Sequence, residues 1–135
     1  MTAWLLPTFG YIVLLGATGI TARLALRTIS WEQMVLWVPI AYAMFALLLI
    51  AFRGARFPLG AGGGWAAVTA FCAAGALILF FVALTHGDAG KVVPVSSAYP
   101  VVTVLGAALF LSEPITGVRV AGTVLVVLGV VLLTR

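Results

Sequence analysis

The stretch Lys91–Pro114, KVVPVSSAYPVVTVLGAALFLSEP, decides the fold of this chain. It is apolar enough to cross a bilayer, yet its first half carries two prolines, two serines and a tyrosine. A proline removes a backbone N–H and disturbs the preceding helical turn, so the stretch predicts a membrane-spanning helix with a broken, polar middle. Polar groups inside a membrane span usually mark a place where something binds or passes.

The composition indicates the same class of protein. Hydrophobic residues make up 64% of the 135 residues and charged residues only 7%, whereas a soluble domain has about 25% charged residues. The net charge of +4 does not indicate a nucleic-acid partner, because the basic residues lie singly at the ends of apolar runs. There they are expected to anchor helix ends at the lipid headgroups. The sequence therefore predicts an integral membrane protein.

Five segments are long enough to span a membrane. A hydrocarbon core about 30 Å thick needs roughly 20 apolar residues per helix. The length of the segments and their lack of two-residue alternation argue against a β-barrel. The sequence predicts an all-α membrane protein, with five transmembrane helices and short loops in a single domain over residues 1–135. The expected spans cover about residues 4–22, 31–52, 65–85, 91–111 and 115–133.

The connections between these spans carry recognisable signals. Ser30 is expected to be the N-cap of the second helix. Residues 53–64 include Pro58 and three consecutive glycines, a pattern typical of a flexible loop. Pro114 suits the first turn of the fifth helix, and Glu113 suits the positive end of that helix.

The polar residues of the fourth span allow two interpretations. Ser96, Tyr99, Pro100 and Thr103 recur at helical spacing on one face. In the first interpretation this face binds a substrate, and Pro94 and Pro100 make the helix adjustable. In the second, the helix is merely kinked, and its hydroxyls satisfy its own backbone and a neighbouring helix. The first interpretation assigns substrate binding on this span to Ser96, Ser97, Tyr99 and Thr103.

Three tyrosines, Tyr11, Tyr42 and Tyr99, fall near the middle of predicted spans. A phenol in hydrocarbon needs a hydrogen-bond partner, so these side chains are expected to face the protein interior. Their rings could hold an organic cation, at about 0.5–2 kcal/mol per ring. The alternative is ordinary hydrogen bonding between helices, at about 0.6 kcal/mol each.

The titratable residues lie at the ends of spans. His86, Asp88 and Lys91 form one group, and Glu113 precedes the fifth span. These four residues are candidates for a gate or for proton coupling. The alternative is a solvated membrane-edge turn, with Glu113 in a structural role. With one His and one Cys, no spacing suits a metal site, and the glycines at 60–64 lack the ending of a phosphate loop. We expect no enzyme activity and no cofactor.

The second half of the chain resembles the EamA domain of the drug/metabolite transporter superfamily. The resemblance rests on segments 83–84, 89–94 and 99–103, on Leu111-Ser112-Glu113-Pro114, and on the Gly-rich apolar run 122–133. It implies export of small metabolites or drugs across the cytoplasmic (inner) membrane. Most members carry two such repeats of inverted orientation, so this single repeat implies a homodimer. The related small multidrug exporters have a glutamate deep in their first helix, whereas no acid lies between Trp4 and Ala22 here.

The charges give almost no preference for one orientation. Orientation follows the side with excess Lys and Arg. An odd number of spans places Arg53, Arg56 and Arg119 on one side, and Arg23, Arg27, Lys91 and Arg135 on the other. We therefore expect insertion in both orientations and an antiparallel homodimer.

Gly122 and Gly129, seven residues apart, would let helices approach closely.

These observations lead to one function and one alternative. The chain is expected to be a half-size transporter that carries a small amphipathic or cationic compound by alternating access. Tyr11, Tyr42 and the polar face of the fourth span would hold this compound at mid-depth. The alternative is a non-transporting membrane subunit that packs against a larger partner.

Overall fold

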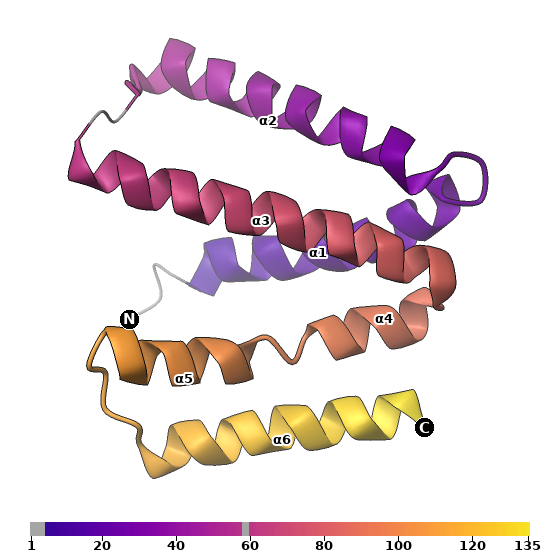
Figure 1. Cartoon of the computed structure of the whole chain (residues 1–135), viewed down its shortest axis with the longest axis vertical. Helices are drawn as coiled ribbons and strands as arrows, with labels where there is room; N and C mark the ends of the chain where they lie inside the picture. The colour runs from indigo at the N-terminus through magenta and orange to yellow at the C-terminus, as the bar shows by residue number, and fades with distance from the viewer. Residues whose placement is uncertain (1–4, 58–59) are drawn as a thin grey trace. The chain divides into compact units, whose positions relative to one another are not determined.

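The computed structural model describes residues 5–57 and 60–135, and every element in this part of the chain is helical. The helices are α1 Leu5–Ala25, α2 Trp31–Arg53, α3 Ala61–His86, α4 Ala89–Ser96, α5 Pro100–Phe110 and α6 Gly117–Thr134 (Figure 1). Five stretches of these helices are long and apolar enough to cross a membrane, and the fourth of them combines α4 and α5. The predicted all-α membrane fold is confirmed.

The fourth span is broken in its middle, as its prolines predict. Residues 97–99 form turns between α4 and α5 (Figure 1). Ala98 N donates to Val95 O at 3.1 Å, and Tyr99 N donates to Ser96 O at 3.4 Å. These bonds reach back three residues, as in the tighter 3₁₀ turn. Pro100 then opens α5, a position for which its fixed φ is well suited.

The start of α2 follows the predicted capping chemistry. Gln33 N donates to Ser30 Oγ at 3.3 Å, and Ser30 N donates to Gln33 Oε1 at 3.0 Å. This reciprocal pair is a capping box, which satisfies two N–H groups that the helix leaves unbonded. The other end of α2 stops at Gly54, whose φ of 62° is the left-handed conformation that glycine adopts without strain.

Two predicted helix starts are wrong. The glycines at 62–64 were expected in a flexible loop, but they lie in the first turns of α3. A helix is the conformation that satisfies the backbone at a membrane, so the apolar run that follows extends its helix over them. Pro114 was expected in the first turn of the last helix, but α6 begins at Gly117. Thr116 Oγ1 accepts from Arg119 N at 3.3 Å, and this N-cap sets the start instead.

The helices form two compact units. One contains α1 as far as Ile20 together with residues 87–135, and the other contains residues 21–86. In the first, α4 and α5 both pack against α6, and in the second, α2 packs against α3. Within the chain, α2, α4, α5 and α6 hold no buried residue. Their apolar side chains are therefore left for lipid or for another protein chain. The single-domain organisation over residues 1–135 stays a prediction.

Arg23 has a structural contact beyond the expected headgroup anchoring. Its guanidinium donates to the carbonyl oxygen of Leu84, in the last turn of α3, and this contact is partly buried. The last carbonyls of a helix have no intrahelical partner and form its negative end, so a cation stabilises them. Leu84 itself is fully buried, as is Ala22 beside Arg23. Arg23 thereby ties the end of α1 to the end of α3 within the second unit.

Candidate functional site

The predicted substrate-binding residues are distributed over both units. Tyr42 lies on α2 in the unit of residues 21–86, with 66% of its surface exposed. The others belong to the unit built from α1, α4, α5 and α6. In that unit they lie at or beside the break in the fourth span: Tyr11 on α1, Ser96 at the end of α4, Ser97 and Tyr99 in the turn, and Thr103 on α5.

The break in the fourth span is linked to α1 by a pair of tyrosines. The Tyr11 and Tyr99 phenols lie close enough to each other to interact electrostatically. Both nevertheless remain exposed, at 51% and 55%. The expectation that all three tyrosines face the interior of the chain is therefore wrong for the single chain. The physical reason is that α2, α4 and α5 bury no residue, so the faces that carry Tyr42 and Tyr99 remain uncovered. Residues 6–17 of α1, which include Tyr11, are exposed as well.

The hydroxyl groups at the break donate to the backbone of their own span. Ser96 Oγ donates to Val93 O at 2.8 Å, and Ser97 Oγ donates to the same oxygen at 3.0 Å. Thr103 Oγ1 donates to Tyr99 O at 3.3 Å. A hydroxyl that has donated its hydrogen still offers two oxygen lone pairs. This part of the span is therefore suited to accept hydrogen bonds from a ligand, as an ammonium or amide group would require.

The prolines leave the backbone of the fourth span incompletely bonded. Pro94 lies inside α4 and lacks the N–H that would bond to the Gly90 carbonyl. Pro100 likewise cannot donate to the carbonyl of Ser96, which instead accepts the long bond from Tyr99 N. With fewer bonds to break, α4 and α5 can change their angle more easily than two halves of a continuous helix.

The four candidate gate residues do not form one cluster. His86 ends α3, Asp88 is the N-cap of α4, and Lys91 lies in the first turn of α4. Glu113 lies in the connection that follows α5. Because the fourth span separates these two connections, Glu113 is expected at the opposite membrane surface from the other three. Among the described residues, no group of three His, Cys, Asp or Glu side chains could hold a metal ion.

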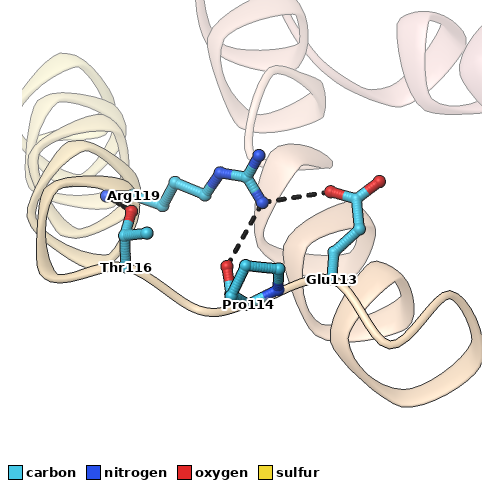
Figure 2. A network of polar contacts seen from close by, with 4 residues as sticks. All are labelled: Glu113, Pro114, Thr116 and Arg119. Atoms are coloured by element: carbon cyan, nitrogen blue, oxygen red, sulfur yellow. Dashed lines mark hydrogen bonds and ion pairs between the residues drawn. The ribbon is translucent and has the colours of Figure 1, made fainter.

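Glu113 belongs to a polar network in the α5–α6 connection that the sequence did not reveal. Arg119 Nη1 donates to Glu113 Oε2 at 3.0 Å and to Pro114 O at 3.3 Å, while Thr116 caps the same turn (Figure 2). The carboxylate and the guanidinium form an ion pair in which each side chain is about half exposed. The pair joins residues six positions apart across a turn. No helical pattern in the sequence indicates a contact at this spacing. Arg119 was considered only as a charge that orients the chain.

A second contact that the sequence did not reveal joins α1 to α4. Gly19 is buried, and a Cβ atom at this position would lie 2.6 Å from Val93 Cγ2. Such a distance is too short for two carbon atoms, so a side chain at this position would require α4 or the Val93 side chain to move. The signal available in the sequence was the glycine pair Gly16 and Gly19 within an apolar run. Spacing alone does not tell which of the two lies at the contact.

Residues 2–135 match the model of the EamA-like transporter family. The chain belongs to this family. The resemblance noted in the sequence is thereby confirmed, and the match covers nearly the whole chain, including the first half. The protein is a multi-pass membrane protein of a transporter family, consistent with its five candidate spans.

One relative matches part of the chain. The EamA-like chain is 43% identical over 60 residues to an uncharacterised protein of Methanocaldococcus jannaschii. The matched stretch covers 44% of this chain and 43% of that protein, so the two are aligned over less than half of their lengths. No solved structure matches the chain.

Proposed function

We propose that this EamA-like protein exports small amphipathic or cationic compounds across the cytoplasmic membrane. The observation that carries the proposal is the Tyr11–Tyr99 pair at the break of the fourth span, in a member of a transporter family. A broken helix with polar groups at mid-depth is how many transporters build a binding site.

The chemistry of the break favours a cation as the substrate. The faces of Tyr11 and Tyr99 attract positive charge by about 0.5–2 kcal/mol per ring. The oxygens of Ser96, Ser97 and Thr103 have already donated their hydrogens to backbone carbonyls, so they offer lone pairs to a donor. An organic amine or ammonium compound uses both kinds of contact. Tyr42 lies in the other unit, and its role in substrate binding stays a prediction from the sequence.

Alternating access is proposed to use the flexibility of the fourth span. The bonds lost at Pro94 and Pro100 allow α4 and α5 to tilt separately. Each half ends at a charged connection: His86, Asp88 and Lys91 before α4, and Glu113 after α5. We propose that these two connections act as the gates on the two membrane sides. Opening the second gate would separate Glu113 from Arg119, an exposed ion pair of the kind worth about 0.2–1 kcal/mol.

A homodimer is proposed to complete the transporter. Residues 1–135 would form one EamA repeat, and two copies in opposite orientations would reproduce the inverted repeats of two-repeat members. Two observations support this arrangement. The basic residues are divided three against four between the two sides, and the apolar faces of α2, α5 and α6 are not covered within the chain.

Flux by the purified protein tests the proposed function directly. The protein is reconstituted alone into proteoliposomes, and ethidium, a planar aromatic cation, is the probe. Ethidium should cross these membranes at least about tenfold faster than those of empty liposomes, because the break would bind a cation. The measurement is ethidium fluorescence against time, with and without an imposed pH gradient. The protein would instead be a non-transporting subunit if it gives no ethidium flux and co-purifies stably with one larger membrane protein.

The sidedness of the C-terminus tests the antiparallel dimer. Cys72 is replaced by Ala, one cysteine is added after Arg135, and cells are labelled with an impermeant maleimide before and after the membranes are opened. Because the charge bias is one residue, we expect roughly half of the chains to be labelled from each side. Labelling from one side only would exclude the antiparallel arrangement while leaving the flux result standing.

A further inference from the structure

A groove lies between α5 and α6. Its volume is about 340 Å³, and it is formed entirely by residues of one unit. Pro100, Thr103 and Ala107 line it from α5, and Gly122, Thr123 and Val126 line it from α6. Glu113 and Arg119 lie at its end in the α5–α6 connection. The groove is thus mostly apolar along its length, with two opposite charges at one end.

The length of this groove along α5 matches the thickness of one leaflet of a bilayer. The α5–α6 connection joins two spans, so it lies at a membrane surface. Pro100 comes ten residues before Phe110, the last residue of α5. At a rise of about 1.5 Å per residue, the groove reaches roughly 15 Å from that end of the helix. Half of a hydrocarbon core about 30 Å thick is the same distance. An acyl chain that enters from this surface would therefore lie along the whole groove.

The charged end of the groove has capacity for a headgroup. Within the described part of the chain, both side-chain bonds of Arg119 use Nη1 (Figure 2), so three N–H donors remain on Nε and Nη2. A guanidinium is the side chain best suited to bind a phosphate. Glu113 uses Oε2 for its bond to Arg119, and its other oxygen can accept from an ammonium group. Both side chains are about half exposed, so a ligand can reach them.

We propose that the α5–α6 groove binds one phospholipid of the phosphatidylethanolamine type. The acyl chain lies between α5 and α6, the phosphate contacts Arg119, and the primary ammonium contacts Glu113. This headgroup is complementary to the Glu113–Arg119 ion pair. It carries a phosphate for the guanidinium and, beside it, a hydrogen-bonding cation for the carboxylate. The groove shares Thr103 with the proposed substrate site, and Glu113 and Arg119 with the proposed gate. Lipid binding is nevertheless measured without transport, so its test does not depend on flux.

Lipid titrations of the delipidated protein test the headgroup contacts. Binding is measured by native mass spectrometry with phosphatidylethanolamine, phosphatidylcholine and phosphatidylglycerol of identical acyl chains. Phosphatidylcholine has no N–H to donate to Glu113, and phosphatidylglycerol has no cation. We expect phosphatidylethanolamine to bind about fivefold to tenfold more tightly than either, as one charge-assisted hydrogen bond allows. Glu113→Gln should remove the preference over phosphatidylcholine, and Arg119→Gln should weaken binding of all three.

A pair of glycine variants tests the groove itself. A Cβ atom added at Gly122 or at Gly129 would meet no other atom within 4 Å, so both positions on α6 accept a side chain. Gly122 lines the groove and Gly129 does not. Gly122→Leu should therefore abolish tight binding of phosphatidylethanolamine, and Gly129→Leu should leave it unchanged.

Several results would overturn the lipid site. Equal affinity of the wild-type protein for the three lipids would remove the headgroup argument, whatever the variants do. Unchanged binding by Gly122→Leu would show that the lipid lies elsewhere. If Gly122→Leu instead converts a dimer to a monomer and the wild-type dimer binds no lipid tightly, a second copy of the chain occupies the groove.

Discussion

Replacing Tyr99 with alanine should lower ethidium flux at least about tenfold, because the substitution removes a ring from the proposed cation site and ends the interaction with Tyr11. The side chain is 55% exposed within the chain. Its removal should therefore leave little cavity, and the amount of protein in the membrane should stay the same. The measurement is initial ethidium flux into proteoliposomes, divided by the amount of reconstituted protein.

Matched variants separate a role in binding from a role in packing. Tyr99→Phe keeps the ring and loses only the hydroxyl, so its flux should fall between wild type and Tyr99→Ala. Phe110→Ala removes an exposed ring from the far end of α5, and its flux should be unchanged. Ser97→Ala removes a lone-pair acceptor at the break and should give a smaller loss than Tyr99→Ala. If all of these variants retain full flux, the polar residues of the fourth span have only a structural role.

The Gly19→Ala variant should be less stable than wild type by about 1–3 kcal/mol, the usual penalty for overpacking a tight contact. The added Cβ would lie 2.6 Å from Val93 Cγ2, so α4 must move away from α1 or Val93 must change its rotamer. Either movement loosens the packing that holds the first half of the fourth span. The measurement is the free energy of unfolding in a titration with sodium dodecyl sulfate.

Two controls tie this loss to the Gly19–Val93 contact. Gly16→Ala changes a glycine on the same helix whose added Cβ would meet no atom within 4 Å. It should be neutral or stabilise the protein by up to about 1 kcal/mol, since alanine favours helix more than glycine does. In the double variant Gly19→Ala/Val93→Ala, the clashing methyl groups are gone, so part of the stability should return. Equal stability of Gly16→Ala and Gly19→Ala would contradict the close approach of α1 and α4.

Features governed by local chemistry were predictable from the sequence. The broken fourth span follows from Pro94 and Pro100, because each proline removes an N–H wherever the chain folds. Ser30 followed by Gln33 specifies a capping box within four residues. The start of α6 shows the limit of such signals. Pro114 and Thr116 both favour a helix N-terminus. The helix begins after Thr116, because the Thr116 hydroxyl accepts a hydrogen bond from Arg119 N.

The contacts between helices could not be predicted in the same way. The Tyr11–Tyr99 pair joins residues 88 positions apart, and nothing in their separate surroundings specifies that they meet. The Gly19–Val93 contact depends on how α1 and α4 cross, which two glycines in an apolar run do not determine. The Glu113–Arg119 pair depends on the path of a six-residue connection. Each of these requires tertiary structure, whereas apolar length alone determines the number of spans.

The break in the fourth span also has a consequence for how the protein enters the membrane. α4 has 8 residues and α5 has 11, so neither is close to the roughly 20 residues that a bilayer requires. Neither half can be recognised as a span during synthesis, and the two must be inserted as one unit. The polar residues at the break are therefore carried into the bilayer by the apolar run of α5. A loss of apolarity in α5 should therefore act first on membrane insertion, and it would change the orientation of α6.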